Sequence, residues 1–568
     1  AEAGMGKSRL AAEIIHLALE AGLRGCGGEC LSHGANTPYL VWRSLLANLF
    51  GLDMNWPLET QVQRLRSELT AIDPALLPRL PLLGAALNLP IPENELTRSL
   101  DAQLRKTSLE YLVAACLRYY SQQTPMLLVL EDCHWIDPLS NDLLEAVGRS
   151  TADLPILMLV VYRPPEANRE HPAVARFGNF TEIRLSEFTP AEAQRLVALK
   201  LEQLFGDASN GLGAGQSVPA EFVERLTERA GGNPFYIDEM VNLIHDRGLN
   251  LADPRTLASF ELPDSLHSLI ISRIDRLPEA PKSTLKVASV IGRSFRSSWV
   301  RGVYPSLGTL KQIKGHLSEL SRLEITPLDK VEPELEYIFK HIVTREVAYA
   351  SLALATRTML HGALGQFIEH TYPEELGRYL DLLAHHYSLS ESADKQREYY
   401  RKAGDAARHA YANESAVDYY QRLLPLLDGA ERSQAMLDLG EVWQITGQWG
   451  EANDICQAAL NLAQAAQDQS TTARCQYALG RIARLQGDYP AALKWLELAR
   501  QAYQDRAEYQ GLSETMREIG IIYWSQGSYS QALERFEKVL QLKDGLKDQS
   551  VVYQAMSNIG LVHWYQGE

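Results

Sequence analysis

Two continuous hydrophobic runs stand out in the first third of the chain. One spans residues 125–130 and leads into Glu131 and Asp132, and the other spans residues 156–162 and leads into Arg163. Uninterrupted runs of this length are typical of strands that are buried on both faces of a parallel sheet. We therefore predict an α/β domain here, with polar side chains at the carboxyl ends of its strands, where such sheets bind their ligands.

The middle of the chain has the spacing of amphipathic helices. Residues 188–193 contain a Thr-Pro-x-Glu helix start, and residues 222–230 form a second amphipathic stretch. Glycines at 231–232 end that helix, and Pro234 can begin the next one. Residues 262–277 predict a capped helix, and helices alternate with short hydrophobic runs up to about residue 350. This pattern predicts a small helical lid followed by a mixed segment.

The last third of the chain repeats with a period of 40 residues. Each full unit has the pattern Gly-x-aromatic-x-x-Ala-x-x-x-large, and a second glycine lies seven residues before it. The pattern residues are Gly447, Trp449, Ala452, Cys456; Gly487, Tyr489, Ala492, Leu496; and Gly527, Tyr529, Ala532, Phe536. The glycines that recur before them are Gly440, Gly480 and Gly520, and Gly560 continues the series. A small alanine allows close approach of two antiparallel helices, the aromatic fills the space between them, and glycine permits the turn. The pattern predicts tetratricopeptide-like repeats.

Such repeats stack into a superhelix whose concave face binds proteins, peptides or small ligands. Because the usual period is about 34 residues, each unit must carry extra loop or helix length. Residues 351–425 predict a degenerate leading repeat or a helical linker, and further repeats are expected beyond residue 568. Four aromatic residues can lie either on the concave face or in the core between helices: Trp443, Tyr523, Trp524 and Trp564.

The first eight residues nearly match the phosphate-loop pattern GxxxxGK[ST]. Gly4 and Gly6 allow backbone N–H groups to turn toward phosphates, Lys7 reaches the β and γ oxygens, and Ser8 can ligate magnesium. The helix that follows directs its positive dipole end at the same anion. Ala1 replaces the first glycine of the pattern, and the strand that should precede the loop is not in the sequence, so we expect the chain to be a fragment.

The strand-end residues predicted above supply the other half of a magnesium nucleotide site. One of Glu131 and Asp132 can hold the metal, directly or through water, while the other polarises the attacking water. The alternative is a solvated strand terminus. Arg163, after the neighbouring strand, can donate to the γ-phosphate or form a surface ion pair.

Length and charge narrow the possibilities further. The chain has 568 residues, enough for about four folded units. Its net charge of −16 argues against direct binding of nucleic acid by this segment. The longest hydrophobic stretch, residues 154–162, is far shorter than the ~20 residues that span a bilayer. No ordered Ser/His/Asp set, reactive Cys/His pair or dinucleotide fingerprint supports acyl transfer, redox chemistry or glycoside hydrolysis.

The cysteines predict a reducing compartment, with the cytoplasm as the default. Six are scattered without a dense framework: Cys26, Cys30, Cys116, Cys133, Cys456 and Cys475. Cys26 and Cys30 form a CxxxC, but no second pair stands at zinc spacing, so we predict two thiols on a strand and no metal site there.

These motifs together resemble the signal-transduction ATPases with numerous domains (STAND), an AAA+ and NACHT-like class of P-loop ATPases. Within that class they resemble the ATPase-tetratricopeptide part of regulators associated with bacterial class III adenylate cyclases, kinases, and maltose-activator or LuxR-type transcription factors. The resemblance covers nearly the whole chain. It rests on four stretches in this order: residues 4–10 (GMGKSRL), residues 37–39 (TPY) with Trp42, residues 128–138 (LVLEDCHWIDP) and residues 162–164 (YRP).

The resemblance implies a nucleotide-controlled switch that uses ATP, ADP and magnesium. Met5 and Arg9 join the nucleotide-binding loop, Pro234 packs on the adenine ring, and His341 contacts the ADP β-phosphate. Lys340 is the alternative for His341, which can equally be an ordinary half-buried histidine. Slow hydrolysis resets the switch, and the ATP form opens and oligomerises to drive an effector outside this chain.

The predicted domains follow the same order. They are a nucleotide-binding core at 1–165 with a helical insertion at about 51–110, a helical lid at 166–260, a winged-helix-like domain at 261–350, a linker or degenerate repeat at 351–425, and repeats at 426–568.

Three other functions stay open at this point. A LuxR-type transcription activator differs only in a DNA-binding domain that lies outside this chain. A motor would need rapid turnover and a trans arginine, which the sequence does not identify. A tetratricopeptide scaffold with an inactive nucleotide fold gains weight from Ala1 and from glutamate, not aspartate, at position 131.

Overall fold

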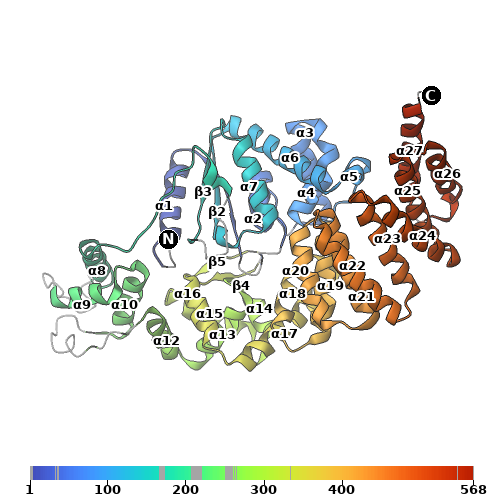
Figure 1. Cartoon of the computed structure of the whole chain (residues 1–568). Helices are drawn as coiled ribbons and strands as arrows, with labels where there is room; N and C mark the ends of the chain where they lie inside the picture. The colour runs from blue at the N-terminus through green and yellow to red at the C-terminus, as the bar shows by residue number, and fades with distance from the viewer. Residues whose placement is uncertain are drawn as a thin grey trace. The chain divides into compact units, whose positions relative to one another are not determined.

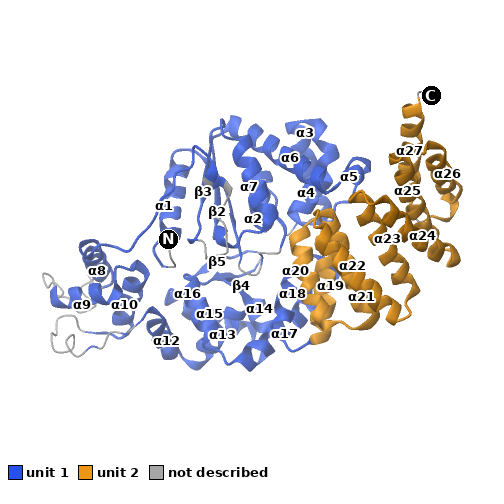
Figure 2. Ribbon diagram, in the orientation of Figure 1, with its two compact units in different colours: residues 1–392 blue, residues 393–568 orange. Residues whose placement is uncertain are grey.

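The computed structural model describes residues 4–31, 34, 37–54, 56–164, 173–205, 220–249, 260, 263, 265–332, 334–546 and 548–566. Residues 1–3 of the phosphate-loop pattern and residues 262 and 264 of the predicted capped helix lie outside this set. The chain divides into two compact units, residues 1–392 and residues 393–568 (Figures 1 and 2).

A three-stranded parallel sheet forms the centre of the first unit. Its strands are β1 (Arg24–Glu29), β2 (Met126–Glu131) and β3 (Ile156–Val160), in the order β1-β2-β3. The register places Glu29 opposite Glu131, so these two carboxylates lie at the same edge of the sheet. The hydrophobic run at 125–130 forms the central strand, and its side chains from Met126 to Leu130 are all buried, as predicted for such a run.

Helices cover both faces of this sheet. One face packs against α1 (Lys7–Glu20), where Ala18 lies in one buried cluster with Leu127 and Val129. The other face carries Met126, Leu128 and Leu130 and packs in one large core with a group of helices: α2 (Leu40–Phe50), α3 (Leu58–Ile72), α4 (Leu80–Leu87), α6 (Ala102–Gln123) and α7 (Pro138–Ser150). The short helix α5 (Glu95–Ser99) precedes α6. This three-layer arrangement is the α/β core that the sequence predicts.

Three helices follow β3 and pack around a core of their own. They are α8 (Pro190–Phe205), α9 (Ala220–Ala230) and α10 (Pro234–Asp246). The Thr-Pro-x-Glu sequence forms a helix start as predicted, because the Glu192 carboxylate accepts hydrogen bonds from the backbone N–H and the hydroxyl of Thr189. We call these helices the α8–α10 segment.

A mixed segment comes next and contains a small antiparallel sheet. The sheet has the order β4-β6-β5, with β4 (Ser294–Arg296), β5 (Leu328–Lys330) and β6 (Glu336–Ile338). Five helices pack with it: α12 (Leu266–Arg276), α13 (Glu279–Ile291), α14 (Ser297–Val303), α15 (Leu310–Arg322) and α16 (Ile342–Ala350). We call this the α12–α16 body. Two more helices, α17 (Leu354–Thr371) and α18 (Leu380–Ser388), follow in the first unit.

The second unit is entirely helical over its described residues. Its helices are α19 (Ala393–His409), α20 (Asn413–Leu423), α21 (Gly429–Ile445), α22 (Trp449–Ala465), α23 (Gln469–Leu485), α24 (Tyr489–Asp505), α25 (Tyr509–Ser525), α26 (Tyr529–Gln541) and α27 (Ser550–Gln566). From α21 to α25 each helix has 17 residues. The length beyond an ordinary tetratricopeptide unit therefore lies in the helices, while the turns between them stay short.

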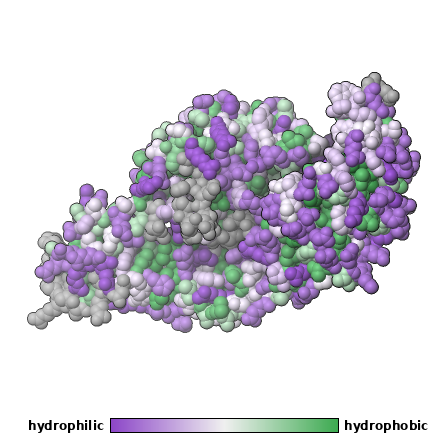
Figure 3. Space-filling model, in the orientation of Figure 1, coloured by the Kyte–Doolittle hydropathy of each residue, from purple (hydrophilic) through white to green (hydrophobic). Residues whose placement is uncertain are grey.

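The described surface agrees with the composition. Most of it is polar in the view of Figure 3, and hydrophobic residues form separate patches. All six cysteines are buried thiols. None of the described helices combines the length and hydrophobicity that crossing a membrane requires.

Candidate functional site

The loop before α1 has the backbone of an anion-binding turn. Gly4 and Gly6 have φ angles of 81° and 87°, which residues with a Cβ adopt only with strain. Helix α1 begins at Lys7, and the Gly6 carbonyl accepts the Leu10 N–H at 2.9 Å. Ser8 and Arg9 are exposed on the first turn. The loop therefore leads into the amino end of a helix with a lysine and a serine on its first turn, a geometry that suits an anionic ligand.

Three carboxylates gather at the carboxyl edge of the parallel sheet. Glu29 ends β1, Glu131 ends β2 directly opposite it, and Asp132 follows in the left-handed conformation with φ 52°. Burial raises the pKa of both Glu29 and Glu131, and the proximity of the carboxylates to one another adds to the rise. Grouped acids of this kind favour a cation among them.

One arginine from the α12–α16 body reaches this edge. Arg293 Nη1 donates a hydrogen bond to the Glu29 carboxylate and lies 3.4 Å from Asp132 Oδ2. On its other side Asp132 has His134, whose Nδ1 is 3.9 Å from Asp132 Oδ1. Arg293 opposes the upward pKa shifts of Glu29 and Glu131. Sequence reasoning missed both Glu29 and Arg293.

The start of α10 contacts the phosphate loop. Asn233 caps the helix by accepting the backbone N–H groups of Phe235 and Tyr236, and Pro234 is its first residue. The Phe235 N–H donates to the Gly4 carbonyl at 3.3 Å. A Cβ at Gly4 would stand 3.1 Å from both Asn233 Oδ1 and Phe235 Cβ. Gly4 is thus required for this approach as well as for the turn.

His341 lies beside the same helix start. Its ring packs on Phe235 with 4.0 Å between the centroids, and its Nε2 is buried without a hydrogen-bond partner among the described residues. Burial lowers the pKa of His341 to about 4, so the ring is neutral at pH 7. The adjacent Lys340 is paired with Glu324. Of these two candidates, His341 is the one that faces the start of α10.

Arg163 follows β3 and is half-buried. It makes no hydrogen bond or ion pair with the residues that the structure describes. The neighbouring Tyr162 hydroxyl donates to Glu182 at 3.2 Å. The surface ion pair that was the alternative for Arg163 does not form within the described part of the chain.

Comparison with known protein families finds one match in the N-terminal α/β region and another in the helical repeats. Residues 1–161 match the AAA ATPase domain family, and residues 431–505 match the tetratricopeptide repeat family. The chain carries an AAA ATPase domain and tetratricopeptide repeats. The predicted fold class, an α/β P-loop core followed by an all-α repeat array, is thereby confirmed.

Individual relatives are distant. An uncharacterized protein of Rhizobium meliloti (strain 1021) is 25% identical over 378 residues, which make up 64% of this chain and 34% of that protein. The chain thus spans about a third of the length of this curated relative. A STAND protein with a tetratricopeptide repeat sensor from Pyrococcus horikoshii is 12% identical, with a TM-score of 0.37 over 95% of this chain and 84% of that one. BtubC from P. vanneervenii is 16% identical, with a TM-score of 0.29 over 38% of this chain and 85% of that one.

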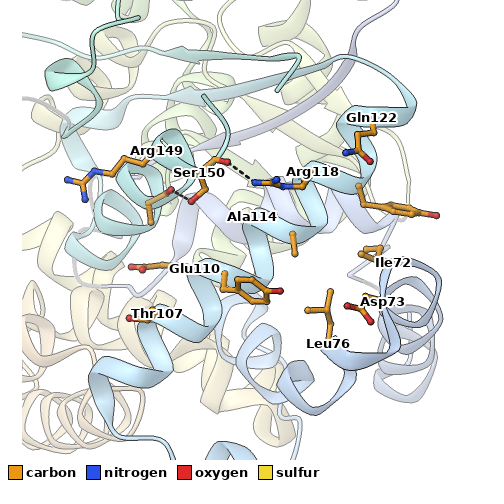
Figure 4. Close-up of a pocket in the computed structure, with 14 residues that line it drawn as sticks. Ile72, Asp73, Leu76, Thr107, Glu110, Ala114, Arg118, Gln122, Arg149 and Ser150 are labelled. Atoms are coloured by element: carbon orange, nitrogen blue, oxygen red, sulfur yellow. Dashed lines mark hydrogen bonds between the residues drawn. The ribbon is translucent and has the colours of Figure 1, made fainter. Parts of the chain in front are cut away.

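Two cavities in the described part of the AAA ATPase domain differ in their relation to the phosphate loop. A cavity of about 340 Å³ lies along β3 and is lined by Lys7, Leu10 and Ile14 of α1 and by residues 156–162. A larger one, of about 780 Å³, lies between α3, α6 and α7 (Figure 4). Arg118 on its wall donates to the Ser150 carbonyl at 3.3 Å. None of the predicted nucleotide-site residues lines the larger cavity.

The structure places most of the predicted nucleotide-site residues in three groups. Gly4, Met5, Gly6, Lys7, Ser8 and Arg9 form the loop and the first turn of α1; Glu131 and Asp132 lie at the sheet edge; and Pro234 and His341 flank Phe235. Among the described residues, no three acidic, histidine or cysteine side chains form a ready-made metal cage. Mg²⁺ usually keeps several waters and takes only one or two carboxylates, so the acids of this edge fit it without such a cage.

The carboxylate of Asp137 connects motif residues of the AAA ATPase domain that lie far apart in the sequence. Its buried carboxylate accepts the backbone N–H of Tyr39 at 3.2 Å and that of Ser140 at 2.9 Å. The Trp42 indole donates to the Ser140 carbonyl at 3.0 Å. Burial raises the pKa of Asp137 to about 6, whereas these hydrogen bonds oppose the rise. Asp137 therefore ties the starts of α2 and α7 together.

Replacing Asp137 by alanine should lower the free energy of unfolding of the first unit by about 1–3 kcal/mol, because two buried N–H groups lose their acceptor. Urea unfolding of the purified protein measures the loss. Asp153→Ala, at an exposed position of the same domain, is the matched control and should leave the transition unchanged. Equal transitions for the two variants would contradict the structural role of Asp137.

Proposed function

We propose that this chain is a nucleotide-controlled signalling switch of the STAND class. In this proposal ATP and ADP, bound at the phosphate loop, favour different arrangements of the segments around it. The tetratricopeptide array binds a protein partner or a small ligand, and the ATP-bound form opens, oligomerises and drives an effector outside this chain. The AAA ATPase domain and the repeat array are the two parts that such a switch requires.

The observation that carries the proposal is the convergence of two further segments on the nucleotide edge. The α8–α10 segment touches the phosphate loop through the Phe235 N–H and the Gly4 carbonyl, and the α12–α16 body touches the strand-end acids through Arg293. A ligand at this junction contacts groups from three parts of the chain. It can therefore favour one arrangement over another, which a nucleotide held by the core alone could not do.

The residues present fit a magnesium nucleotide. The loop glycines, Lys7 and the amino end of α1 would receive the phosphates, with Met5, Ser8 and Arg9 completing the loop. Ser8, Glu131 and Asp132 would hold magnesium, which as a Lewis acid neutralises charge on the phosphate oxygens. The excess of carboxylates over cations at the sheet edge supports a divalent cation there.

Pro234 and His341 would complete the site on the side of the α8–α10 segment. Pro234 is half-buried at the start of α10, where it can pack on the adenine ring. The buried His341 Nε2, without a partner among the described residues, can accept or donate one hydrogen bond to the ADP β-phosphate. His341 packs directly on Phe235, so a contact with nucleotide would couple the α12–α16 body to α10.

Hydrolysis in this proposal is slow and serves as a reset. Glu131 or Asp132 orients and polarises a water, and Arg163 stabilises charge that develops on the γ-phosphate. Because Arg163 has no partner in the described part of the chain, it need not break an existing ion pair to do so.

The division of the chain belongs to the same proposal. The core at 1–165, with its insertion at about 51–110, binds the nucleotide. Residues 166–260 act as the lid, and residues 261–350 act as a winged-helix domain. Residues 351–425 link these three parts to the repeat array at 426–568. The small antiparallel sheet β4-β6-β5 among five helices supports the winged-helix assignment.

The test begins with the nucleotide that the purified protein carries. Nucleotide is released by denaturation and identified by chromatography for the wild type, for Lys7→Ala and for Lys311→Ala, which removes an exposed lysine of α15. We expect bound ADP in the wild type and in Lys311→Ala. Lys7→Ala should lose it and bind added magnesium nucleotide at least about tenfold more weakly, since a charge-assisted contact to phosphate is removed.

Two other results would argue against the switch. A wild-type protein that carries no nucleotide and binds neither ATP nor ADP would be a repeat scaffold on an inactive nucleotide fold. Rapid steady-state turnover would indicate a motor, because a switch at rest must keep its bound nucleotide for longer than one signalling event lasts. Magnesium-dependent phosphate release, measured on the same samples, separates slow from rapid turnover.

A further inference from the structure

Arg293 connects two parts of the first unit at the nucleotide edge. It lies between α13, which ends at Ile291, and β4, which begins at Ser294. Its Nη1 reaches Glu29, 264 positions away in sequence, and also Asp132. Among the described residues, its Nη1 thus provides the ion pairs between the α12–α16 body and the strand-end carboxylates.

A rigid frame presents this side chain to the sheet edge. The Phe339 N–H donates to the Arg293 carbonyl at 2.8 Å, and β4 pairs with β6 immediately beyond it. Phe295 and Phe339 are both buried, with 5.5 Å between their ring centroids. Gly292, with φ 157°, ends α13 just before Arg293. The contact with the core therefore depends on the packed α12–α16 body and does not belong to a loose loop.

The carboxylates that Arg293 holds are the ones that a divalent cation would need. Arg293 shares the Asp132 carboxylate with any metal ligated there, and it also offsets the repulsion among Glu29, Glu131 and Asp132. A guanidinium and a magnesium ion beside the same oxygen repel each other. Binding of one must therefore weaken binding of the other, by the reciprocity that holds for any two coupled ligands.

We propose that Arg293 is a latch that holds the α12–α16 body on the strand-end carboxylates, and that Arg293 releases Asp132 when this carboxylate takes a divalent cation together with bound ATP. The holding half of this proposal stands on the contacts alone, whereas the release half rests on the nucleotide switch proposed above. The latch gives that switch a specific electrostatic contact to break.

The experiment measures hydrogen exchange of the full chain, region by region, in the absence of nucleotide and with magnesium ATP or magnesium ADP. The variant is Arg293→Gln, and the matched control is Arg301→Gln, which removes an exposed arginine from α14 of the same body. Arg293→Lys keeps the positive charge and shows whether the effect of Arg293→Gln comes from a general folding defect. The reported regions are β1, the residues after β2, and β4 with β6.

Without nucleotide, Arg293→Gln should exchange about tenfold faster than the wild type in these regions, since a half-buried ion pair is lost. Arg301→Gln should match the wild type, and Arg293→Lys should retain most of the protection. Magnesium ATP should increase exchange of the same regions in the wild type and change little in Arg293→Gln, which is already released, whereas magnesium ADP should leave the wild type protected. A reversed pair, Arg293→Glu with Glu29→Arg, should recover protection that Arg293→Glu alone loses.

Each other outcome overturns a stated half of the proposal. If hydrogen exchange is the same in Arg293→Gln and Arg301→Gln, Arg293 does not hold the α12–α16 body on the strand-end carboxylates. If the wild type binds magnesium ATP with unchanged exchange, the release half is wrong. If the protein binds no nucleotide at all, the release half falls together with the proposed function, and the nucleotide-free comparison of Arg293→Gln with Arg301→Gln still decides the holding half.

Discussion

Replacing Arg273 by methionine should lower the free energy of unfolding of the first unit by about 3–5 kcal/mol, because it leaves a buried carboxylate without its partner. Arg273 of α12 donates to Glu239 at 2.7 Å, and both side chains are only 8% exposed. Its Nε lies 3.2 Å from Asp246 Oδ2, and its Nη2 lies 3.3 Å from the Leu323 carbonyl. One side chain thus joins α10, α12 and the end of α15.

Urea unfolding of the purified protein measures this loss as a shift of the first-unit transition. Arg276→Met, at an exposed position on the same helix, is the control and should shift it by less than about 0.5 kcal/mol. The double variant Glu239→Leu with Arg273→Met should recover most of the stability, since no charge is then left unpaired. A double variant as unstable as Arg273→Met would locate the loss in packing and not in the ion pair.

Periodic features of the chain were predictable from the sequence. The helices α21, α23 and α25 begin at Gly429, Gln469 and Tyr509, which repeats the 40-residue spacing of the glycines. The central strand also followed from its pattern, because a hydrophobic run buried on both faces has no polar alternation to obscure it. The sequence left open whether loops or helices carry the extra length of each repeat, since both interpretations fit one period.

The candidate site was predictable where a motif keeps its residues close together. Gly4 to Arg9 form one turn, and Glu131 with Asp132 follow one strand, so each group could be assigned from local order. Glu29 escaped notice because β1 has the sequence RGCGGE, which has neither the hydrophobic run nor the alternation of an ordinary strand. Its pairing with Glu131 requires the register of the sheet.

Contacts between distant segments could not be predicted at all. Arg293 meets Glu29 across 264 positions, and nothing in the sequence around either residue names the other. The one local signal at Arg293 is Gly292, which breaks a helix just before a charged residue. The packing of Phe235 on His341 is similar, because each residue follows an element boundary that predicts its backbone and not its neighbour.

The glycines of the repeat array make the second large prediction. Gly440, Gly480 and Gly520 lie on α21, α23 and α25, and a Cβ at each would stand 2.6 Å from an atom of the large residue on the next helix: Cys456, Leu496 and Phe536 respectively. The pattern Gly and large residue in each unit is thus one packing contact repeated three times. Phe536 is 1% exposed, so its ring fills the space that Gly520 leaves.

Phe536→Ala should lower the free energy of unfolding of the second unit by about 3–5 kcal/mol, because it opens a cavity beside Gly520. Gly520→Ala in the wild type should cost about 1–3 kcal/mol, since the Phe536 ring cannot move away from the added methyl group without disturbing its own packing. In the Phe536→Ala background the sign should reverse, because the methyl group then enters empty space and alanine favours a helix by up to about 1 kcal/mol over glycine.

Gly560 supplies the matched control, because it occupies the equivalent place on α27 and a Cβ there would meet nothing within 4 Å. Gly560→Ala should therefore be neutral or stabilising in the wild-type chain. Thermal and urea unfolding of the second-unit transition measure all four variants. Equal costs for Gly520→Ala with and without the Phe536 ring would mean that helix geometry, and not the contact between α25 and α26, requires glycine at this position of the repeat.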